Sequence, residues 1–111
     1  MQTVAVVLNV DPEQTEAFEA GFRKHELPIW RDFHERGSMV FATLNRMDIS
    51  SVATEGAVQY LITVVFTDDR GHHEHDSDPR FAEWNEMADA YQVAQPLALG
   101  GDTVVSIGVD G

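Results

Sequence analysis

The sequence predicts an α+β fold of the ferredoxin type, with a four-stranded antiparallel sheet and both helices on one of its faces. Three observations lead to this prediction. Strand-like and helix-like segments follow the order βαββαβ, an Asp-Pro pair opens each helix, and no internal repeat divides the chain. Right-handed crossovers then place the two helices on the same side of one sheet. The 111 residues suit a single domain spanning 1–111.

The first half of the chain predicts a strand, a long helix and a second strand. Apolar residues alternate over 2–10, and Asp11-Pro12 then opens a helix, because aspartate accepts from free amides and proline at the first helical position loses no bond. Pro28 predicts a kink or break near Glu26. Gly37 is expected to end the helical stretch, and the next strand is predicted at 38–46.

The second half predicts two strands around a shorter helix. Residues 58–67 are rich in β-branched and aromatic side chains, which is typical of a strand. A polar histidine-containing loop precedes the helix that starts at Asp78-Pro79 and continues to Tyr91. Residues 92–102 contain Pro96 and Gly100-Gly101, so we expect an extended connection ending in a turn. The last strand is predicted at 103–110.

The composition indicates in which cellular compartment the protein works and which binding partners its charge disfavours. The formal net charge is −12, which repels phosphate backbones and argues against nucleic acid and anionic membranes. The chain has no cysteine, which fits a reducing compartment, and its first residues resemble a strand and lack the features of a signal peptide. We therefore expect a cytoplasmic protein.

The predicted strands are apolar on both sides. In the strand at 58–67, Tyr60, Ile62, Val64 and Phe66 alternate with Leu61 and Val65. Because two helices cover only one face of the sheet, the other face would be a large exposed apolar patch. A second copy packed by two-fold symmetry is the commonest way to cover such a face, so a homodimer through the sheet faces is predicted.

The chain resembles the dimeric α+β-barrel superfamily, which includes antibiotic-biosynthesis-type monooxygenases, haem-degrading monooxygenases, muconolactone isomerases and stress-responsive barrel proteins. The resemblance rests on Phe18 to Phe22 after the first strand, Pro28 in the long helix, and Phe81 to Tyr91 in the second helix. It covers nearly the whole chain in pattern, although its motifs are loose. It implies that each subunit holds a ligand between the helices and the sheet.

Several candidate site residues follow from the residue types and from this resemblance. Haem-degrading and some quinone-forming monooxygenases have an asparagine in the first strand and a tryptophan nearby, and Asn9 and Trp84 resemble these. The haem-type histidine late in the second helix is replaced by Tyr91 and Gln92, which argues against haem. Six aromatic residues are candidates for the wall of a small-molecule pocket: Trp30, Phe33, Phe41, Tyr60, Trp84 and Tyr91.

The histidines that precede the second helix form the sharpest local cluster. In an extended loop, His73 and His75 would point the same way, and Asp76 would add an oxygen ligand, a donor set that suits Zn, Ni, Cu or Fe(II). Alternatively, one of these histidines turns inward as a general base, or the loop is only solvated surface. We expect this loop to form the rim of a cavity whose floor includes Trp84 and Tyr91.

Two functions remain open at this point. The first is an enzyme resembling the cofactor-independent monooxygenases, with a small aromatic or phenolic ligand, no cofactor, and Asn9, His73 or His75 as catalytic groups. The second is a non-enzymatic dimer that binds a divalent metal through the loop from His72 to His75, with His73, His75 and Asp76 as ligands, or that acts as an interaction module.

Overall fold

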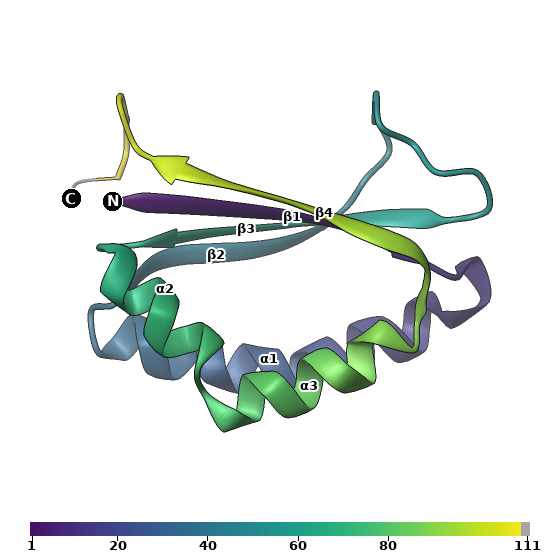
Figure 1. Ribbon diagram of the computed structural model, residues 1–111, viewed down its shortest axis with the longest axis horizontal. Helices are drawn as coiled ribbons and strands as arrows, with labels where there is room; N and C mark the ends of the chain where they lie inside the picture. Colours follow the sequence, from purple (N-terminus) through teal and green to yellow (C-terminus); the bar gives the residue numbers. More distant parts are fainter. Residues whose placement is uncertain (110–111) are drawn as a thin grey trace.

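The computed structural model describes residues 1–109 and places four strands and three α-helices along them (Figure 1). In chain order the elements are β1 (Gln2–Val10), the 3₁₀ turn η1 (Pro12–Gln14), α1 (Thr15–Glu35), β2 (Met39–Arg46), β3 (Val58–Phe66), α2 (Asp69–Asp76), α3 (Pro79–Asp89) and β4 (Gln92–Asp102). No helix of the described residues combines the length and the apolar character needed to cross a bilayer.

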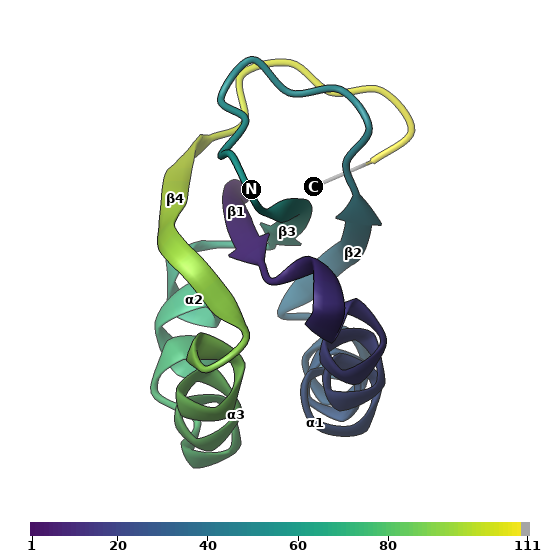
Figure 2. The ribbon, with the colours of Figure 1, turned by 90° about the vertical axis from the view of Figure 1, so that its right-hand side faces the viewer.

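The four strands form one antiparallel sheet in the order β2-β3-β1-β4, and the helices cover one face of it (Figures 1 and 2). This arrangement confirms the predicted ferredoxin-like fold. β1 and β3 are the central strands, and residues on the helix side of β1, such as Val4 and Val6, lie opposite Val64 and Ile62 of β3. The middle of the sheet therefore presents β-branched side chains to the helices.

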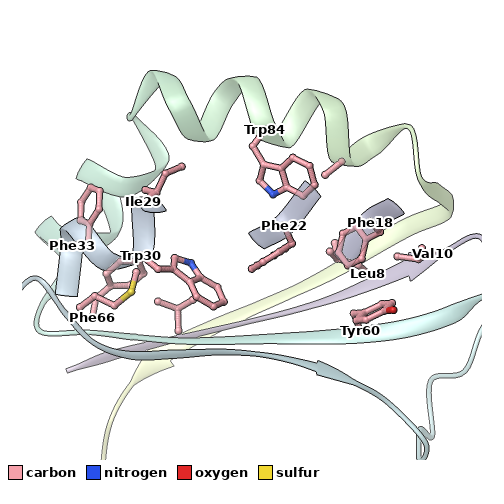
Figure 3. Packing of buried hydrophobic residues seen from close by; sticks show 13 residues of the cluster. Leu8, Val10, Phe18, Phe22, Ile29, Trp30, Phe33, Tyr60, Phe66 and Trp84 are labelled. Atoms are coloured by element: carbon pink, nitrogen blue, oxygen red, sulfur yellow. The ribbon is translucent and has the colours of Figure 1, made fainter. Parts of the chain in front are cut away.

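Aromatic side chains fill the space between the helices and the sheet (Figure 3). Phe18 of α1 packs against Tyr60 of β3 with ring centroids 4.8 Å apart, and Phe22 packs edge-on against Trp30 at 5.0 Å. Trp84 brings α3 into the same cluster, where it lies 6.1 Å from the ring of Phe22. The core thus joins both long helices to the central strands.

The first helix was predicted to kink or break near Glu26, and the break is wrong, because α1 runs without interruption from Thr15 to Glu35. Proline removes the hydrogen bond to the carbonyl four residues earlier, here that of Lys24. Lys24 and Pro28 are both exposed, so this carbonyl lies on the side of the helix that meets solvent. The loss is tolerated there, and the helix keeps its apolar face intact from Phe18 to Phe33.

The histidine segment is a helix, which corrects the predicted loop. Asp68 caps α2 by accepting from the backbone N–H of Gly71 at 3.2 Å. A Cβ at Gly71 would meet the Ser38 carbonyl oxygen at 2.9 Å, so glycine allows α2 to dock against the start of β2. This polar helix is therefore stabilised by its cap and by its contact with the sheet, and it has no apolar periodicity by which the sequence could have predicted it.

The last strand was also predicted in the wrong place. β4 covers Gln92–Asp102, and residues 103–109 carry no strand, while residue 110 lies outside the described residues. Gly100 and Gly101 lie within the strand without a positive φ. Gly100 pairs with Val4 and Gly101 with Thr3, so the glycine pair continues the strand and does not form a turn.

Candidate functional site

A cavity of about 440 Å³ lies between the helices and the helix-facing side of the sheet. Its volume falls within the range of roughly 300–1,000 Å³ that is usual for small-molecule sites. The cavity is mainly apolar, and its polar lining is gathered largely where α1 meets α2. The polar groups on its wall are Glu26, His72, His75, Asp76, Asn85 and Gln92.

Glu26 reaches this cavity because it occupies the buried face of α1. It stands four residues after Phe22 and four before Trp30, which is the spacing of one helical face. Glu26 is only 3% exposed, and its Oε1 lies 2.6 Å from Nε2 of the equally buried His75. No group of residues 1–109 bonds to its other oxygen, Oε2, which is also buried. A buried carboxylate oxygen without a partner is costly, so this atom is available to a ligand.

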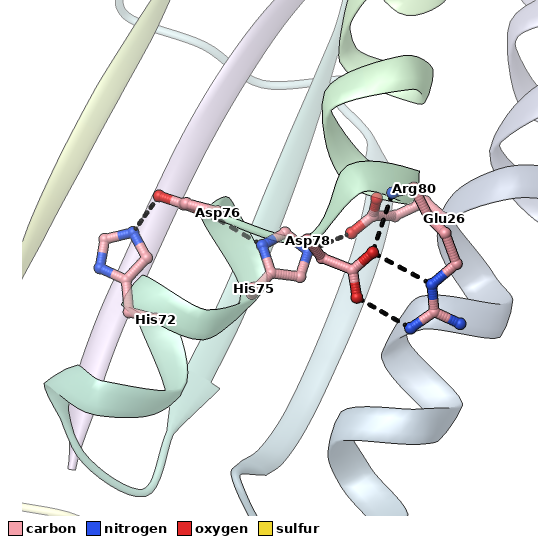
Figure 4. A network of polar contacts seen from close by, with 6 residues as sticks. All are labelled: Glu26, His72, His75, Asp76, Asp78 and Arg80. Atoms are coloured by element: carbon pink, nitrogen blue, oxygen red, sulfur yellow. Dashed lines mark hydrogen bonds and ion pairs between the residues drawn. The ribbon is translucent and has the colours of Figure 1, made fainter.

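The helical form of α2 creates a line of polar groups that begins at Glu26 (Figure 4). His72, His75 and Asp76 are three and four residues apart, so they share one face. His75 Nδ1 lies 3.0 Å from Asp76 Oδ1, and His72 Nε2 lies 2.9 Å from Asp76 Oδ2. The side chain of Asp76 is 51% exposed, so the line connects the buried carboxylate with solvent.

The charges along this line influence one another strongly. Burial by itself lowers the pKa of His75, but the hydrogen bonds and charges of Asp76 and Glu26 outweigh it and raise the pKa to about 9. Burial raises the pKa of the Glu26 carboxyl, and His75 offsets only part of that effect. Burial also favours the neutral form of Asp76, yet the two histidines bring its pKa below the usual value. The Glu26–His75 pair therefore retains a proton at neutral pH.

Aromatic rings enclose the polar groups. His75 is packed between Phe33, Phe66 and Phe81, with ring centroids 4.4–5.9 Å away. Trp84 forms another part of the cavity wall and stands close to Gly21, where a Cβ would meet the indole ring at 2.9 Å. Water exclusion by these rings strengthens electrostatic interactions inside the cavity.

The structure brings together only some of the predicted site residues. Trp30, Trp84 and His75 line the cavity, as does Asp76. Phe33 is buried against His75, and Tyr91 packs edge-on against Phe18 with ring centroids 6.1 Å apart. Tyr60 lines a separate hollow of about 240 Å³ and its hydroxyl donates to Glu19 at 2.5 Å.

Phe41 and Asn9 lie away from the cavity. Phe41 pairs with Val65 on the side of the sheet that faces away from the helices. Asn9 points to the same side, where its amide donates to the Gln95 carbonyl and accepts from Gln59, both at 2.9 Å. The bond to Gln95 joins β1 to β4 where their pairing is irregular, and the bond from Gln59 joins β1 to β3. Asn9 thus links three strands of the sheet.

The predicted metal ligands do not converge. Residues two apart on a helix do not face each other, so His73 is exposed while His75 is buried. Both ring nitrogens of His75 already contact carboxylates. Within residues 1–109 no group of three or more His, Cys, Asp or Glu side chains is arranged to hold a metal ion.

Sequence reasoning missed Glu26, although a signal was present. Phe22, Glu26, Ile29 and Phe33 share helical spacing, which places a glutamate in the middle of an apolar stripe. A glutamate is rarely buried without a partner. His75, 49 residues away, supplies that partner only in the folded chain.

Comparison with solved structures places this architecture among known folds. HapK from Hahella chejuensis matches with a TM-score of 0.70 at 20% identity over 100% of both chains. A mutant of SnoaB, a cofactor-independent oxygenase from Streptomyces nogalater, matches with a TM-score of 0.71 at 17% identity over 96% of both chains. An antibiotic biosynthesis monooxygenase matches with a TM-score of 0.71 at 13% identity, over 95% of this chain and 100% of the other.

The chain has the ferredoxin-like fold of the antibiotic biosynthesis monooxygenases. No family model matches the sequence, and neither does any curated protein. At these low identities the likeness concerns the backbone architecture alone.

Proposed function

We propose that this protein is a cofactor-independent oxygenase of small hydroxyaromatic compounds, which bind in the cavity between the helices and the sheet. The observation that carries the proposal is a buried carboxylate–imidazole pair, Glu26 and His75, at one end of an otherwise apolar cavity. The apolar wall suits an aromatic ring, and the polar end suits a hydroxyl group. The backbone likeness to SnoaB, a cofactor-independent oxygenase, supports the same class of reaction.

The chemistry follows from the acidity of such a substrate. Loss of the hydroxyl proton leaves a phenolate whose ring carbon is electron-rich enough to reduce dioxygen directly. For 1-naphthol, C10H8O and O2 give 1,4-naphthoquinone, C10H6O2, and water. The ring carbon gains one oxygen atom, and the other leaves as water with two substrate hydrogens. The protein's part is to remove the first proton, to orient the ring and to exclude water.

The proposal is tested with 1-naphthol in air-saturated buffer containing a metal chelator. We expect one dioxygen to be consumed for each 1,4-naphthoquinone formed, at a rate well above that of buffer alone. Glu26→Gln should lower this rate by about 10²-fold or more, the usual contribution of general acid–base groups. The matched control is Glu16→Gln, an exposed glutamate of the same helix, which should leave the rate unchanged. Absence of oxygen uptake by the wild-type protein would refute the proposed reaction for this substrate.

We also propose that two copies pair through the sheet faces that the helices leave uncovered. That face carries Ala5, Val7, Phe41, Leu61, Val65, Leu97 and Leu99 by strand register. Residues 47–57 and 103–109 rise from this side of the sheet at its two ends (Figures 1 and 2). They carry exposed apolar residues, including Val104 at 93% and Ile107 at 97%. A second copy covering this face would bury them, as expected for an obligate interface.

A further inference from the structure

The orphaned oxygen of Glu26 and the line of groups behind it point to a specific path for the substrate proton. We infer that Glu26 Oε2 accepts the hydroxyl proton of a phenolic ligand, and that His75 and Asp76 return a proton to solvent. The inference rests on the proposed function, because it requires a hydroxyaromatic ligand in the same cavity. It goes further by naming the acceptor atom, the exit path and the need for a ligand O–H.

The acceptor is identified by geometry. Glu26 lines the cavity, its Oε1 is occupied by His75 Nε2 at 2.6 Å, and its buried Oε2 has no partner within residues 1–109. Burial raises the pKa of the Glu26 carboxyl, and Trp30, which also lines the cavity, acts to lower it, but Trp30 does not reach hydrogen-bonding geometry with Oε2. A ligand inside the cavity can supply the missing partner. Because the surrounding wall is largely apolar, a hydroxyl on an aromatic ring fits both parts of the site. An ether or a plain hydrocarbon would leave the oxygen unpaired at a cost.

The path out of the cavity uses the remaining nitrogen of His75. Before binding, His75 is an imidazolium that donates from Nε2 to Glu26 and from Nδ1 to Asp76, 3.0 Å away. When the ligand O–H bond breaks, its proton joins Oε2 and the electron pair stays on the ligand oxygen. Glu26 is then neutral, so one of the two carboxylates that hold the second proton on the buried imidazole has lost its charge. His75 releases its Nδ1 proton to Asp76, which passes it to water, directly or through His72 at 2.9 Å.

The proton count balances. The ligand loses one proton and becomes a phenolate, Glu26 gains one, His75 loses one, and solvent gains one. The site therefore changes its net charge by −1 when the phenolate forms. Other charged groups near His75 are already paired: Asp78 with Arg80 at 2.9 Å, and Asp32 with Arg80 at 2.6 Å. Their charges therefore stay the same when the phenolate forms, and they do not take the place of Asp76 in the proton path.

Two matched probes test the inference by spectroscopy. 4-Nitrophenol changes its absorption when it loses its proton, and 4-nitroanisole has the same ring without the hydroxyl. In buffer acidic enough to keep free 4-nitrophenol protonated, we expect the wild-type protein to bind it with the visible band of the phenolate. Calorimetry in buffers of different ionisation enthalpy should show about one proton released for each probe bound.

Variants separate the acceptor from the path. Glu26→Gln should bind 4-nitrophenol about tenfold more weakly and without the phenolate band, while its affinity for 4-nitroanisole changes little. Asp76→Asn should keep the 4-nitroanisole affinity but slow the appearance of the band in stopped-flow mixing by about tenfold or more. Glu16→Gln is the control and should match the wild type. If Glu26→Gln unfolds, Glu26→Asp keeps the charge but withdraws the carboxyl by one methylene, and the band should weaken.

The outcomes distinguish this inference from the proposed function. A phenolate band that persists in Glu26→Gln, or wild-type protein that binds 4-nitrophenol only as the neutral phenol, overturns the proton path. If 4-nitroanisole binds in that case, the aromatic site itself stands. If neither probe binds to the wild type, the cavity is not an aromatic site, and both proposals fail. A Glu26-dependent band without oxygen uptake from 1-naphthol would remove the oxygenase reaction alone.

Discussion

At the scale of single residues, hydrogen-bond partners distinguish a buried polar side chain that can bind a ligand from one that stabilises the sheet. Glu26 and Asn9 are both nearly inaccessible, at 3% and 4% exposure. Asn9 uses its amide oxygen and nitrogen on Gln59 and Gln95. Glu26 keeps one oxygen free of protein partners among the described residues. Asn9 is therefore satisfied by bonds within the sheet, whereas Glu26 has an oxygen that can bind a ligand.

The Glu26–His75 pair should make stability fall as pH rises. His75 has a folded-state pKa of about 9 against an ordinary 6.5, so the folded protein binds this proton more tightly. The stabilisation is complete below pH 6.5 and is lost as pH rises through 9. The raised pKa of Glu26 acts in the same direction at lower pH. Thermal melts should therefore show Tm decreasing by several degrees between these values, about 4 °C or more for a domain of this size.

The control for this pH dependence is His75→Asn, which cannot hold the proton. Its melting temperature should be lower at pH 6.5 and nearly flat across the same interval. A wild-type Tm that stays constant or rises between pH 6.5 and 9 would contradict a proton held more tightly in the fold.

Asn9 gives a second test at this scale. Asn9→Ala removes the bond to the Gln95 carbonyl and one of the two bonds of the Gln59 amide, so the free energy of unfolding should fall by about 1–3 kcal/mol. Asn45→Ala removes an exposed asparagine and should cost less than about 0.5 kcal/mol. Denaturant titration measures both. A loss of 1-naphthol binding in Asn9→Ala without a loss of stability would instead place Asn9 at the ligand site.

At the scale of elements, the contact between α1 and α3 shapes the cavity. Because Gly21 has no side chain, the indole of Trp84 on α3 can pack directly against α1. This indole forms part of the cavity wall. Alanine is the better helix former by about 1 kcal/mol, so only steric conflict can make its introduction harmful here.

Gly21→Ala should therefore lower stability by about 1–2 kcal/mol, because its Cβ would lie 2.9 Å from two ring atoms of Trp84. Displacement of the indole should also weaken 1-naphthol binding, measured by tryptophan fluorescence. Trp84→Phe removes the ring atoms concerned, so the double variant should lose less than the sum of the two single changes. Strict additivity in denaturant titrations would show that the contact relaxes at no cost.

At the scale of the whole molecule, the sheet separates two apolar regions with different partners. The helices cover one side (Figure 1), and the cavity lies between them and the sheet. The other side includes exposed residues on β2 and β4, among them Phe41 at 37% and Leu99 at 62% exposure. The pairing proposed for that side leaves the cavity of each copy separate, since the cavity lies across the sheet.

Light scattering should give twice the 12.4 kDa chain mass for the wild type. Leu97→Asp adds a charge to the uncovered face, where Leu97 pairs with Val7 and is 41% exposed. It should shift the mass toward that of a single chain, because an unpaired charge in an interface is strongly unfavourable. The control is Met87→Asp, which alters an exposed apolar residue of α3 and should remain a dimer. A wild-type mass of one chain at micromolar concentration would refute the pairing.

Local signals in the sequence were sufficient for the order of the elements, the two Asp-Pro helix starts and the apolar face of α1, because these depend on neighbours within a few residues. They also identified Trp30, Trp84 and His75 as candidates. They misplaced β4, because Gly100 and Gly101 indicated a turn, whereas both pair with β1 inside the strand. They missed α2, because a polar helix is held by its Asp68 cap and by docking against Ser38. Glu26 and His75 are 49 positions apart in the sequence and form a pair only in the folded chain. Local sequence signals therefore could not predict that each residue provides the buried partner of the other.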